Sequence, residues 1–364
     1  MSATNAARPD WRLIDLFGIA HPIIQAPMAG AMDGALAAEV SHAGGLGSLP
    51  CAMLNAGQIR SEVEKIRRRT DKSFNLNFFC HIPPELNNAR EAAWRDRLVP
   101  YYREFGLDPA APAPASLRMP FDAEFCALIE ELKPRVASFH FGLPSPDLVA
   151  RVKRAGAAVV SSATTVAEAR WLESHGVDAI IAQGFEAGGH RGTFLERDTA
   201  GQAGTFALVP QIADAVKVPV IATGAIADAR GISAALILGA AGAQIGTAYL
   251  FCPEAKISVP YRAALTTAGD DATRITNVMT GRPARGIVNR VMREIGPMSD
   301  LAPEFPLAAG ALAPLRAKAE AGGSGDFSPL WSGQAAALGR ALPAGELTGK
   351  FARETLERLR RLSA

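Results

Sequence analysis

The chain repeats one alternation from residue 21 to about residue 250, a short apolar run followed by a segment rich in Ala, Leu and Glu. Apolar runs without polar alternation indicate strands that are covered on both faces, as in a parallel sheet with crossover helices. The segments between them, such as DGALAAEVSHAG and NAGQIRSEVEKIRRR, begin with Asp, Asn or Thr, which cap the free N–H groups of a helix. We expect strands at 21–28, 45–50, 74–79, 136–142, 157–163, 178–184, 218–224 and 243–250.

Eight such units within about 230 residues favour an α/β fold in which the strands close into a (β/α)8 TIM barrel. An open, doubly wound sheet is the competing arrangement. It is less favoured because no GxGxxG motif follows the first expected strand.

Two regions interrupt the alternation. A helical piece around 85–105 and a linker rich in Pro and Ala separate the third and fourth expected strands, which indicates an excursion over the barrel rim. The second interruption follows the FCPEA segment. We therefore predict a barrel over 1–256, a small inserted α-rich second domain over 257–325, and a return to the barrel with a C-terminal helix over 326–364.

Composition excludes several classes of protein. The 38 basic and 36 acidic residues leave a net charge of +2, and no basic tract carries interleaved aromatics, so no nucleic-acid partner is expected. No apolar run reaches the roughly 18 residues of a membrane span, and the first residues lack the apolar region of a signal peptide. The four cysteines are widely spaced without a CxxC pair, which predicts neither a metal site nor disulfides. We expect a cytoplasmic protein without membrane contact.

Glycines stand where the last two expected strands end. In a barrel, the carboxyl ends of the strands form the active face, and phosphate commonly binds after the seventh and eighth strands. Those places contain Gly224, in a loop that enters a helix capped by Asp228, and Gly246 beside Thr247. Backbone N–H groups and a hydroxyl at these positions predict a phosphate pocket, whereas tight packing of strand on helix would explain one such glycine more readily than two.

Polar side chains stand near the ends of other expected strands, where a purely structural core would favour aliphatic ones. Side-chain amides both donate and accept hydrogen bonds, so Asn77 and Gln183 suit the edge of a heterocycle such as a flavin. Each alone would more often be a satisfied buried amide, but together around one barrel mouth they favour a cofactor. The full set is Gln25, Asn75, Asn77, Ser161, Ser162 and Gln183.

The segment AQGFEAGGHRGTF, residues 182–194, places His190 among glycines directly after an expected strand. Glycine allows close backbone approach to a ligand, and histidine suits proton transfer near neutral pH, although glycine clusters are more often only turns. Arg191 could attract an anion, but exposure to solvent is the favoured interpretation. Among the other histidines, His140 lies near a strand end and could face the barrel mouth.

Seven segments together resemble the FMN-dependent nitronate monooxygenases, formerly called 2-nitropropane dioxygenases: QAPMAG, AGGLGSL, NLNFF, FHFGLP, GFEAGGHRG, PVIATGAIAD and GAQIGTAYL. The resemblance implies an FMN-binding barrel with a small inserted domain, in which His190 is catalytic. It also implies that Ser332 lies near the flavin, and His140 is a weak candidate for substrate contact. The implied FMN contacts are Ala26, Met28, Asn77, Gln183, Gly188, Gly224, Gln244, Ile245, Gly246 and Thr247.

The reaction implied by this resemblance is the oxidation of alkyl nitronates, such as propionate 3-nitronate, or of nitroalkanes by O2 to a carbonyl compound and nitrite. Sequence relatives of such barrels include FMN-dependent NAD(P)H:quinone reductases and enoyl-thioester reductases, which remain alternatives. A flavin- or phosphate-binding barrel without catalytic activity is a further alternative, against which the presence of His190 argues. A homodimer is possible through the segments outside the barrel.

Overall fold

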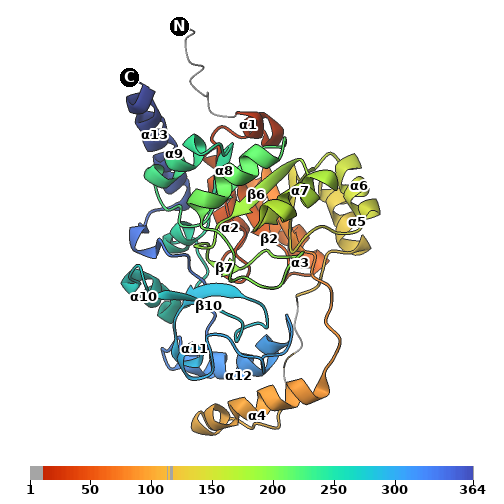
Figure 1. Cartoon of the computed structure of the whole chain (residues 1–364), viewed down its shortest axis with the longest axis vertical. Helices are drawn as coiled ribbons and strands as arrows, with labels where there is room; N and C mark the ends of the chain where they lie inside the picture. The colour runs from red at the N-terminus through yellow and green to blue at the C-terminus, as the bar shows by residue number, and fades with distance from the viewer. Residues whose placement is uncertain (1–10, 113, 115–117, 364) are drawn as a thin grey trace.

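The computed structural model describes residues 11–112, 114 and 118–363 and contains a barrel of parallel strands (Figure 1). Eight strands hydrogen-bond in the order β1-β9-β8-β6-β5-β4-β3-β2, and a parallel bridge between Ile24 and Leu46 joins the first of them to the last. The predicted barrel is therefore confirmed. Its strands are β1 (Ile23–Gln25), β2 (Gly47–Pro50), β3 (Phe74–Phe79), β4 (Val136–His140), β5 (Ala158–Ala163), β6 (Ala179–Gln183), β8 (Val220–Thr223) and β9 (Gly242–Ile245).

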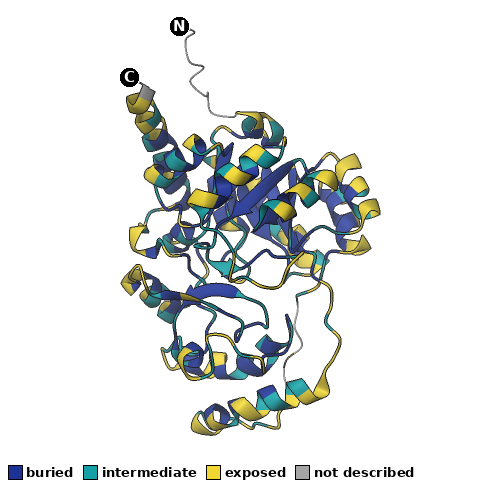
Figure 2. Ribbon diagram, in the orientation of Figure 1, coloured by how far each residue is buried: buried dark blue, intermediate teal, exposed yellow. Residues whose placement is uncertain are grey.

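Helices cover the outside of the barrel, and the strands inside are almost entirely buried (Figure 2). The predicted caps form: the side chains of Asp33, Asn55, Thr165 and Asp228 each accept a hydrogen bond from a backbone N–H in the first turn of a helix. The barrel helices are α1 (Arg12–Phe17), α2 (Gly34–His42), α3 (Ala56–Arg69), α5 (Ala123–Leu132), α6 (Pro146–Arg154), α7 (Val166–Ser174), α8 (Thr205–Ala215), α9 (Ala229–Ile237) and α13 (Ala344–Ser363).

The last strand is shorter than the sequence predicts. β9 ends at Ile245, where its pairing with β1 ends, and the 3-10 helix η1 (Thr247–Phe251) follows. The backbone turns at Gly246, whose carbonyl accepts a hydrogen bond from Tyr249 N at 2.8 Å. Gly246 and Thr247 consequently lie in a turn at the barrel mouth instead of continuing the strand.

A second, smaller core lies outside the barrel, below it in Figure 1. The helix α4 (Asn88–Glu104), which comes from the expected rim excursion, packs there against α12 (Ala308–Ala321): Trp94 Nε1 donates to Ala308 O at 3.2 Å and Tyr102 Oη donates to Ala311 O at 2.6 Å. The predicted domain boundaries stay a prediction. The elements here besides α4 are α10 (Val259–Thr267), β10 (Thr273–Thr276), β11 (Ala284–Ile287), α11 (Arg290–Glu294) and α12 (Ala308–Ala321), and η2 (Ala336–Leu338) leads back to the barrel.

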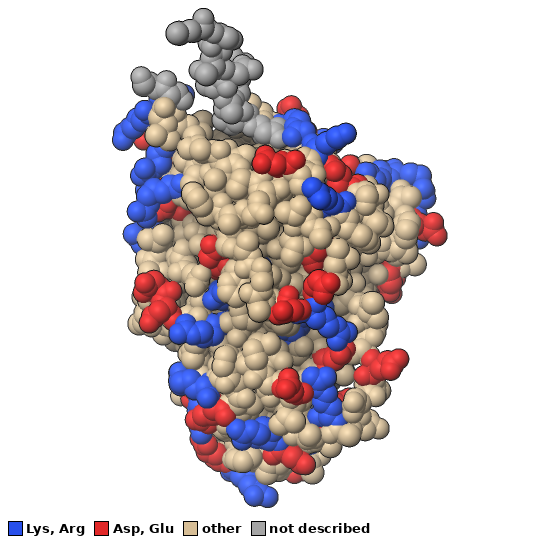
Figure 3. All heavy atoms as spheres, in the orientation of Figure 1, with Lys and Arg blue, Asp and Glu red and all other residues tan. Residues whose placement is uncertain are grey.

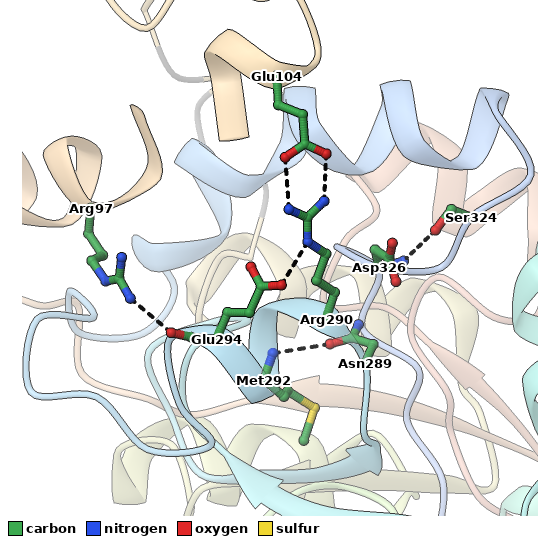
Figure 4. Close-up of polar contacts among 8 residues, drawn as sticks. All are labelled: Arg97, Glu104, Asn289, Arg290, Met292, Glu294, Ser324 and Asp326. Atoms are coloured by element: carbon green, nitrogen blue, oxygen red, sulfur yellow. Dashed lines mark hydrogen bonds and ion pairs between the residues drawn. The ribbon is translucent and has the colours of Figure 1, made fainter. Parts of the chain in front are cut away.

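Arg290, the first residue of α11, fastens α4 to this core (Figure 4). Its Nη1 and Nη2 donate to the two carboxylate oxygens of Glu104 at 2.6 and 2.7 Å, and its Nε donates to Glu294 at 3.0 Å. The guanidinium carbon also lies 5.3 Å from the centre of the Tyr101 ring. A two-point ion pair and ring contact thus join segments that are far apart in the sequence.

A loop of the barrel joins the barrel to this second core. The short strand β7 (Gly189–His190), which follows β6, pairs antiparallel with β11 to complete a three-stranded sheet in the order β10-β11-β7. His190 lies opposite Ala284, and Arg191 N donates to Pro283 O at 2.9 Å. The histidine singled out in the sequence therefore lies between the two cores.

The surface carries charges of both signs, and the face shown in Figure 3 has acidic and basic side chains interspersed without one dominant patch. In the part of the chain that the structure describes, no helix is long and apolar enough to cross a membrane.

Candidate active site

A cavity of about 230 Å³ opens at the carboxyl ends of the barrel strands. Barrel loops line one side, and Trp331, from the segment that returns from the second core, lines another. Most of the predicted site residues meet in this cavity: Ala26, Met28, Asn77, His140, Gln183, Gly188, His190, Gly224, Gln244, Gly246 and Thr247.

Two predicted site residues have side chains elsewhere. The Ile245 side chain is fully buried in the barrel core, and only its carbonyl, which accepts a hydrogen bond from Ala26 N at 2.8 Å, contributes to the mouth. Ser332 is also fully buried, and its hydroxyl donates to Gly333 O at 3.0 Å. The roles of Ile245 and Ser332 stay predictions. In this geometry either residue would contact a ligand in the cavity through its backbone or through neighbouring residues.

The ends of β8 and β9 form the glycine-lined part of the cavity. Gly224 has a φ of 125°, and a Cβ there would lie 2.5 Å from Thr205 Oγ1, so a side chain would fit neither the backbone nor the space. Ala225, the next residue, has a φ of 53°, an uncommon value outside glycine that is often found at functional sites. Across the cavity, Thr247 Oγ1 accepts a hydrogen bond from Gly333 N at 2.9 Å.

The Gln183 amide shapes the histidine loop. Its Oε1 accepts from Gly192 N at 2.8 Å and its Nε2 donates to His190 O at 2.9 Å, so the amide bridges both sides of the histidine. The second Nε2 proton and the second lone pair of Oε1 are left for a ligand. Asn77 is held by Ser138, because its Nδ2 donates to Ser138 Oγ at 2.9 Å and to Ser138 O at 3.3 Å.

His190 is surrounded by aromatic rings, and its side chain makes one hydrogen bond to the residues that the structure describes. Its Nε2 lies 2.9 Å from the hydroxyl of Thr280, which belongs to the turn between β10 and β11. The ring centroids of Phe305 and Trp331 lie 5.2 and 5.3 Å from that of His190. These aromatic rings pack around the imidazole, which remains partly exposed.

His140 supports the loop that carries His190. Its Nδ1 lies 2.6 Å from Ser162 Oγ, and its Nε2 lies 3.2 Å from His190 O. His140 also lines the cavity, as expected from its position near a strand end. Its hydrogen bonds indicate a support for the neighbouring backbone as well as a wall of the cavity.

Three histidines in and near the cavity have lowered pKa values. Burial, followed by the positive charges of Arg118 and Arg282 and the neighbouring histidines, holds the pKa of His190 well below its ordinary value. Burial and Arg282 likewise lower the pKa of His140 to about 3, and burial, Arg282 and Arg118 lower that of His81 to about 4. At neutral pH these rings are unprotonated, and His190 has a lone pair with which to accept a proton.

Comparison with known proteins agrees with this geometry. The model of the family described as nitronate monooxygenase matches residues 10–354. The chain belongs to the nitronate monooxygenase family. It is 44% identical to the nitronate monooxygenase of Paraburkholderia phytofirmans, covering 96% of this chain and 97% of the relative, and 43% identical to that of Pseudomonas aeruginosa, covering 92% and 96%.

Solved structures show the same relationship. The nitroalkane oxidase of Streptomyces ansochromogenes superposes with a TM-score of 0.87 at 37% identity, covering 96% of this chain and 99% of that one. FabK from Thermotoga maritima superposes with a TM-score of 0.74 at 28% identity, covering 98% and 99%.

The favoured interpretation of Arg191 was wrong. The side chain is fully buried, and it donates to Gly184 O and to Gln183 O at 2.8 Å each and to Gln202 Oε1 at 2.7 Å. Carbonyl groups at the end of β6 lack strand partners, and the guanidinium supplies the donors that they need. Arg191 therefore fixes the loop that presents its neighbour His190.

Sequence reasoning missed the residues that the second core contributes. Thr280, Arg282 and Phe305 all lie in the region where no motif was recognised. Arg282 lies with its guanidinium carbon 3.9 Å from the Phe141 ring centre and donates to Thr193 O. A signal was available in the TGRPARG segment, in which Gly281 and Pro283 mark the turn before β11.

Proposed function

We propose that this member of the nitronate monooxygenase family binds FMN and oxidises alkyl nitronates, such as propionate 3-nitronate, and neutral nitroalkanes with O2 to carbonyl compounds and nitrite. One observation carries the proposal: the low-pKa imidazole of His190 lines a cavity whose other end is the glycine-lined mouth of a barrel. Family membership and the likeness to a nitroalkane oxidase support the same reaction class.

The residues at the mouth fit FMN. Gly224 and Gly246 line the cavity beside the N-terminus of α9, where backbone N–H groups suit a phosphate, and Ala26 and Met28 offer an apolar surface for a ring system. Asn77 offers a polar edge at the same opening. FMN bound there would accept electrons from the substrate and allow their transfer to O2.

His190 would handle the proton of a neutral nitroalkane. The α C–H bond breaks, the proton moves to an imidazole nitrogen, and the electron pair is delocalised onto the nitro group. The positive charges of Arg118 and Arg282 that depress the pKa of His190 also favour the anion that forms beside it. A substrate that arrives as a nitronate needs no such proton transfer.

Anaerobic reduction tests the proposal. The chromophore released from denatured protein should be FMN, and an alkyl nitronate should reduce the bound flavin within seconds in the absence of O2. We expect NADH and NADPH to act slowly or not at all. Release of FAD would refute the cofactor assignment.

Rapid reduction by NADH with no response to nitronates would instead establish an NAD(P)H-dependent quinone or enoyl-thioester reductase, an alternative that the similarity to FabK keeps in view. A cytoplasmic location and a homodimer stay predictions.

A further inference from the structure

We propose that Thr280 is a positioning residue that selects the tautomer of His190, with Nε2 protonated and Nδ1 free to accept the substrate proton. The inference rests on the proposed function of His190 as a base. Its starting point is the 2.9 Å contact between His190 Nε2 and Thr280 Oγ1, the only hydrogen bond of this ring within the described residues. Thr280 belongs to the second core and is itself buried.

The two ring nitrogens have different surroundings. Nδ1 of His190 makes no hydrogen bond within the described part of the chain, yet it is not among the buried atoms that lack a partner. It therefore has access to the cavity that His190 lines. A base must present a lone pair to the substrate, so Nδ1 must be unprotonated and the ring proton must reside on Nε2.

A threonine hydroxyl can accept that Nε2 proton. The hydrogen bond persists when Nδ1 gains a second proton, because both nitrogens of an imidazolium are donors. The charged and titratable groups that face the ring are Arg118, Arg282, His81 and His140, and all four disfavour a positive charge on it. Among the described groups around the ring, the Thr280 hydroxyl is the polar partner that supports the protonated state.

Thr280 is held rigidly. The next residue, Gly281, has a φ of 90°, and a Cβ there would lie 2.0 Å from Pro303 O, so this turn is pressed against neighbouring backbone. The Asn277 amide fixes the same turn, because its Nδ2 donates to Ser299 O and its Oδ1 accepts from Ser299 N, both at 2.9 Å. A fixed acceptor specifies a ring orientation better than a mobile one.

The backbone of His190 is fixed as well. Pairing of β7 with β11 sets its position, and its carbonyl contacts the Gln183 and His140 side chains at 2.9 and 3.2 Å. The backbone contacts leave the His190 side chain free to rotate about its own bonds. The hydroxyl of Thr280 restricts that rotation and the choice of tautomer.

Nitrogen-15 NMR of histidine-labelled, flavin-loaded enzyme tests the inference without turnover. The His190 signals are identified by their loss in His190→Asn. In the unmodified enzyme we expect a protonated Nε2 and an unprotonated Nδ1; the tautomer is read from the unmodified enzyme, and His190→Asn serves only to assign the signals. A protonated Nδ1 in the resting enzyme would overturn the proposal.

Two substitutions separate positioning from general stability. Thr280→Val keeps the shape of the side chain but removes the hydroxyl, and should produce a mixture of tautomers. Thr280→Ser restores the hydroxyl and should restore the single tautomer. Thr266→Val, on the exposed face of α10, is the matched control because it removes a hydroxyl from the same core without touching the cavity. A single unchanged tautomer in Thr280→Val would contradict the proposal.

Kinetics give a second readout. In Thr280→Val we expect kcat/KM for a neutral nitroalkane to fall about tenfold, roughly one hydrogen bond, and that for the matching nitronate to change less than about twofold. Thr280→Ser should recover most of the loss. Equal losses on both substrates, or no recovery in the serine variant, would refute the positioning role. If the enzyme oxidises no nitronate at all, the proposed function fails while the tautomer measurement still decides the role of Thr280.

Discussion

The barrel and the second core contribute different kinds of chemical groups to the same site. The barrel contributes mainly backbone and small side chains to the cavity at strand ends, as at Gly224 and Gly246, whereas segments outside the barrel place side chains against the His190 ring, such as the Thr280 hydroxyl and the Phe305 ring. A surface of backbone groups suits a large bound cofactor, and fixed side chains suit proton transfer. Because the two regions contribute different groups, some substitutions should weaken cofactor binding alone and others should slow proton transfer alone.

Replacement of His190 should give the largest effect. His190→Asn removes the base but leaves the glycine-lined end intact, so flavin should remain bound while kcat/KM for neutral nitroalkanes falls by about 10²–10⁴-fold. Nitronates, which are already ionised, should lose much less. Stopped-flow reduction with both substrate forms measures this, and His175→Asn, at the exposed C-cap of α7, is the control.

The pH profile sharpens the same test. The pKa of His190 lies well below its ordinary value, so the base stays unprotonated and its contribution to kcat/KM should stay level between pH 8 and about pH 6.5. It should be lost only as the pH falls further, through the lowered pKa. A loss centred near pH 6.5 that is absent in His190→Asn would mean that the ring is open to water and that burial does not lower its pKa.

Substitution at Gly224 should affect the barrel side alone. Gly224→Ala forces a Cβ toward Thr205 and strains a left-handed backbone, so flavin affinity should fall about 10–100-fold, consistent with a strain of roughly 1–3 kcal/mol. Titration of the apoprotein with FMN measures this. Gly156→Ala is the matched control, since Gly156 has a φ of 90° but nothing lies within 4 Å of the added Cβ. Equal flavin affinity in both variants would place the phosphate elsewhere.

Loss of the Arg290 contact should have the smallest effect and should act on the second core. Arg290→Ala releases Glu104 and the Tyr101 ring, and we expect faster amide exchange in α4 with at most about 1 kcal/mol of lost stability. Arg60→Ala, which breaks an exposed two-point pair with Glu131 on the barrel, is the control and should leave α4 unchanged. Faster exchange throughout the barrel strands in Arg290→Ala would show that the two cores unfold together.

The barrel could be predicted because its signals are local. Apolar runs, helix caps such as Asn55 and Asp228, and glycines at strand ends each follow from a few neighbouring residues. The cavity end formed by Gly224 and Gly246 was predictable for the same reason, since parallel strands bring their carboxyl ends together.

The second core could not be predicted in the same way because its contacts join distant segments. The packing of Trp94 against α12 and the pairing of His190 with Ala284 span about 90 to 210 residues, and no spacing rule encodes them. Arg191 was misjudged because its partners are carbonyl groups at a strand end, which a side-chain pattern does not reveal.

The pairing of β7 with β11 also sets a limit on how this enzyme can vary. Side chains alternate between the two faces of a strand, so a slip of one position on β11 would turn the His190 ring to the opposite face of the three-stranded sheet. The length of the connection between β6 and β7, residues 184–188, therefore sets the register in which β7 pairs with β11. A chain with one residue more or fewer in this connection could keep both cores and the mouth of the barrel, yet point its histidine away from every substrate that enters.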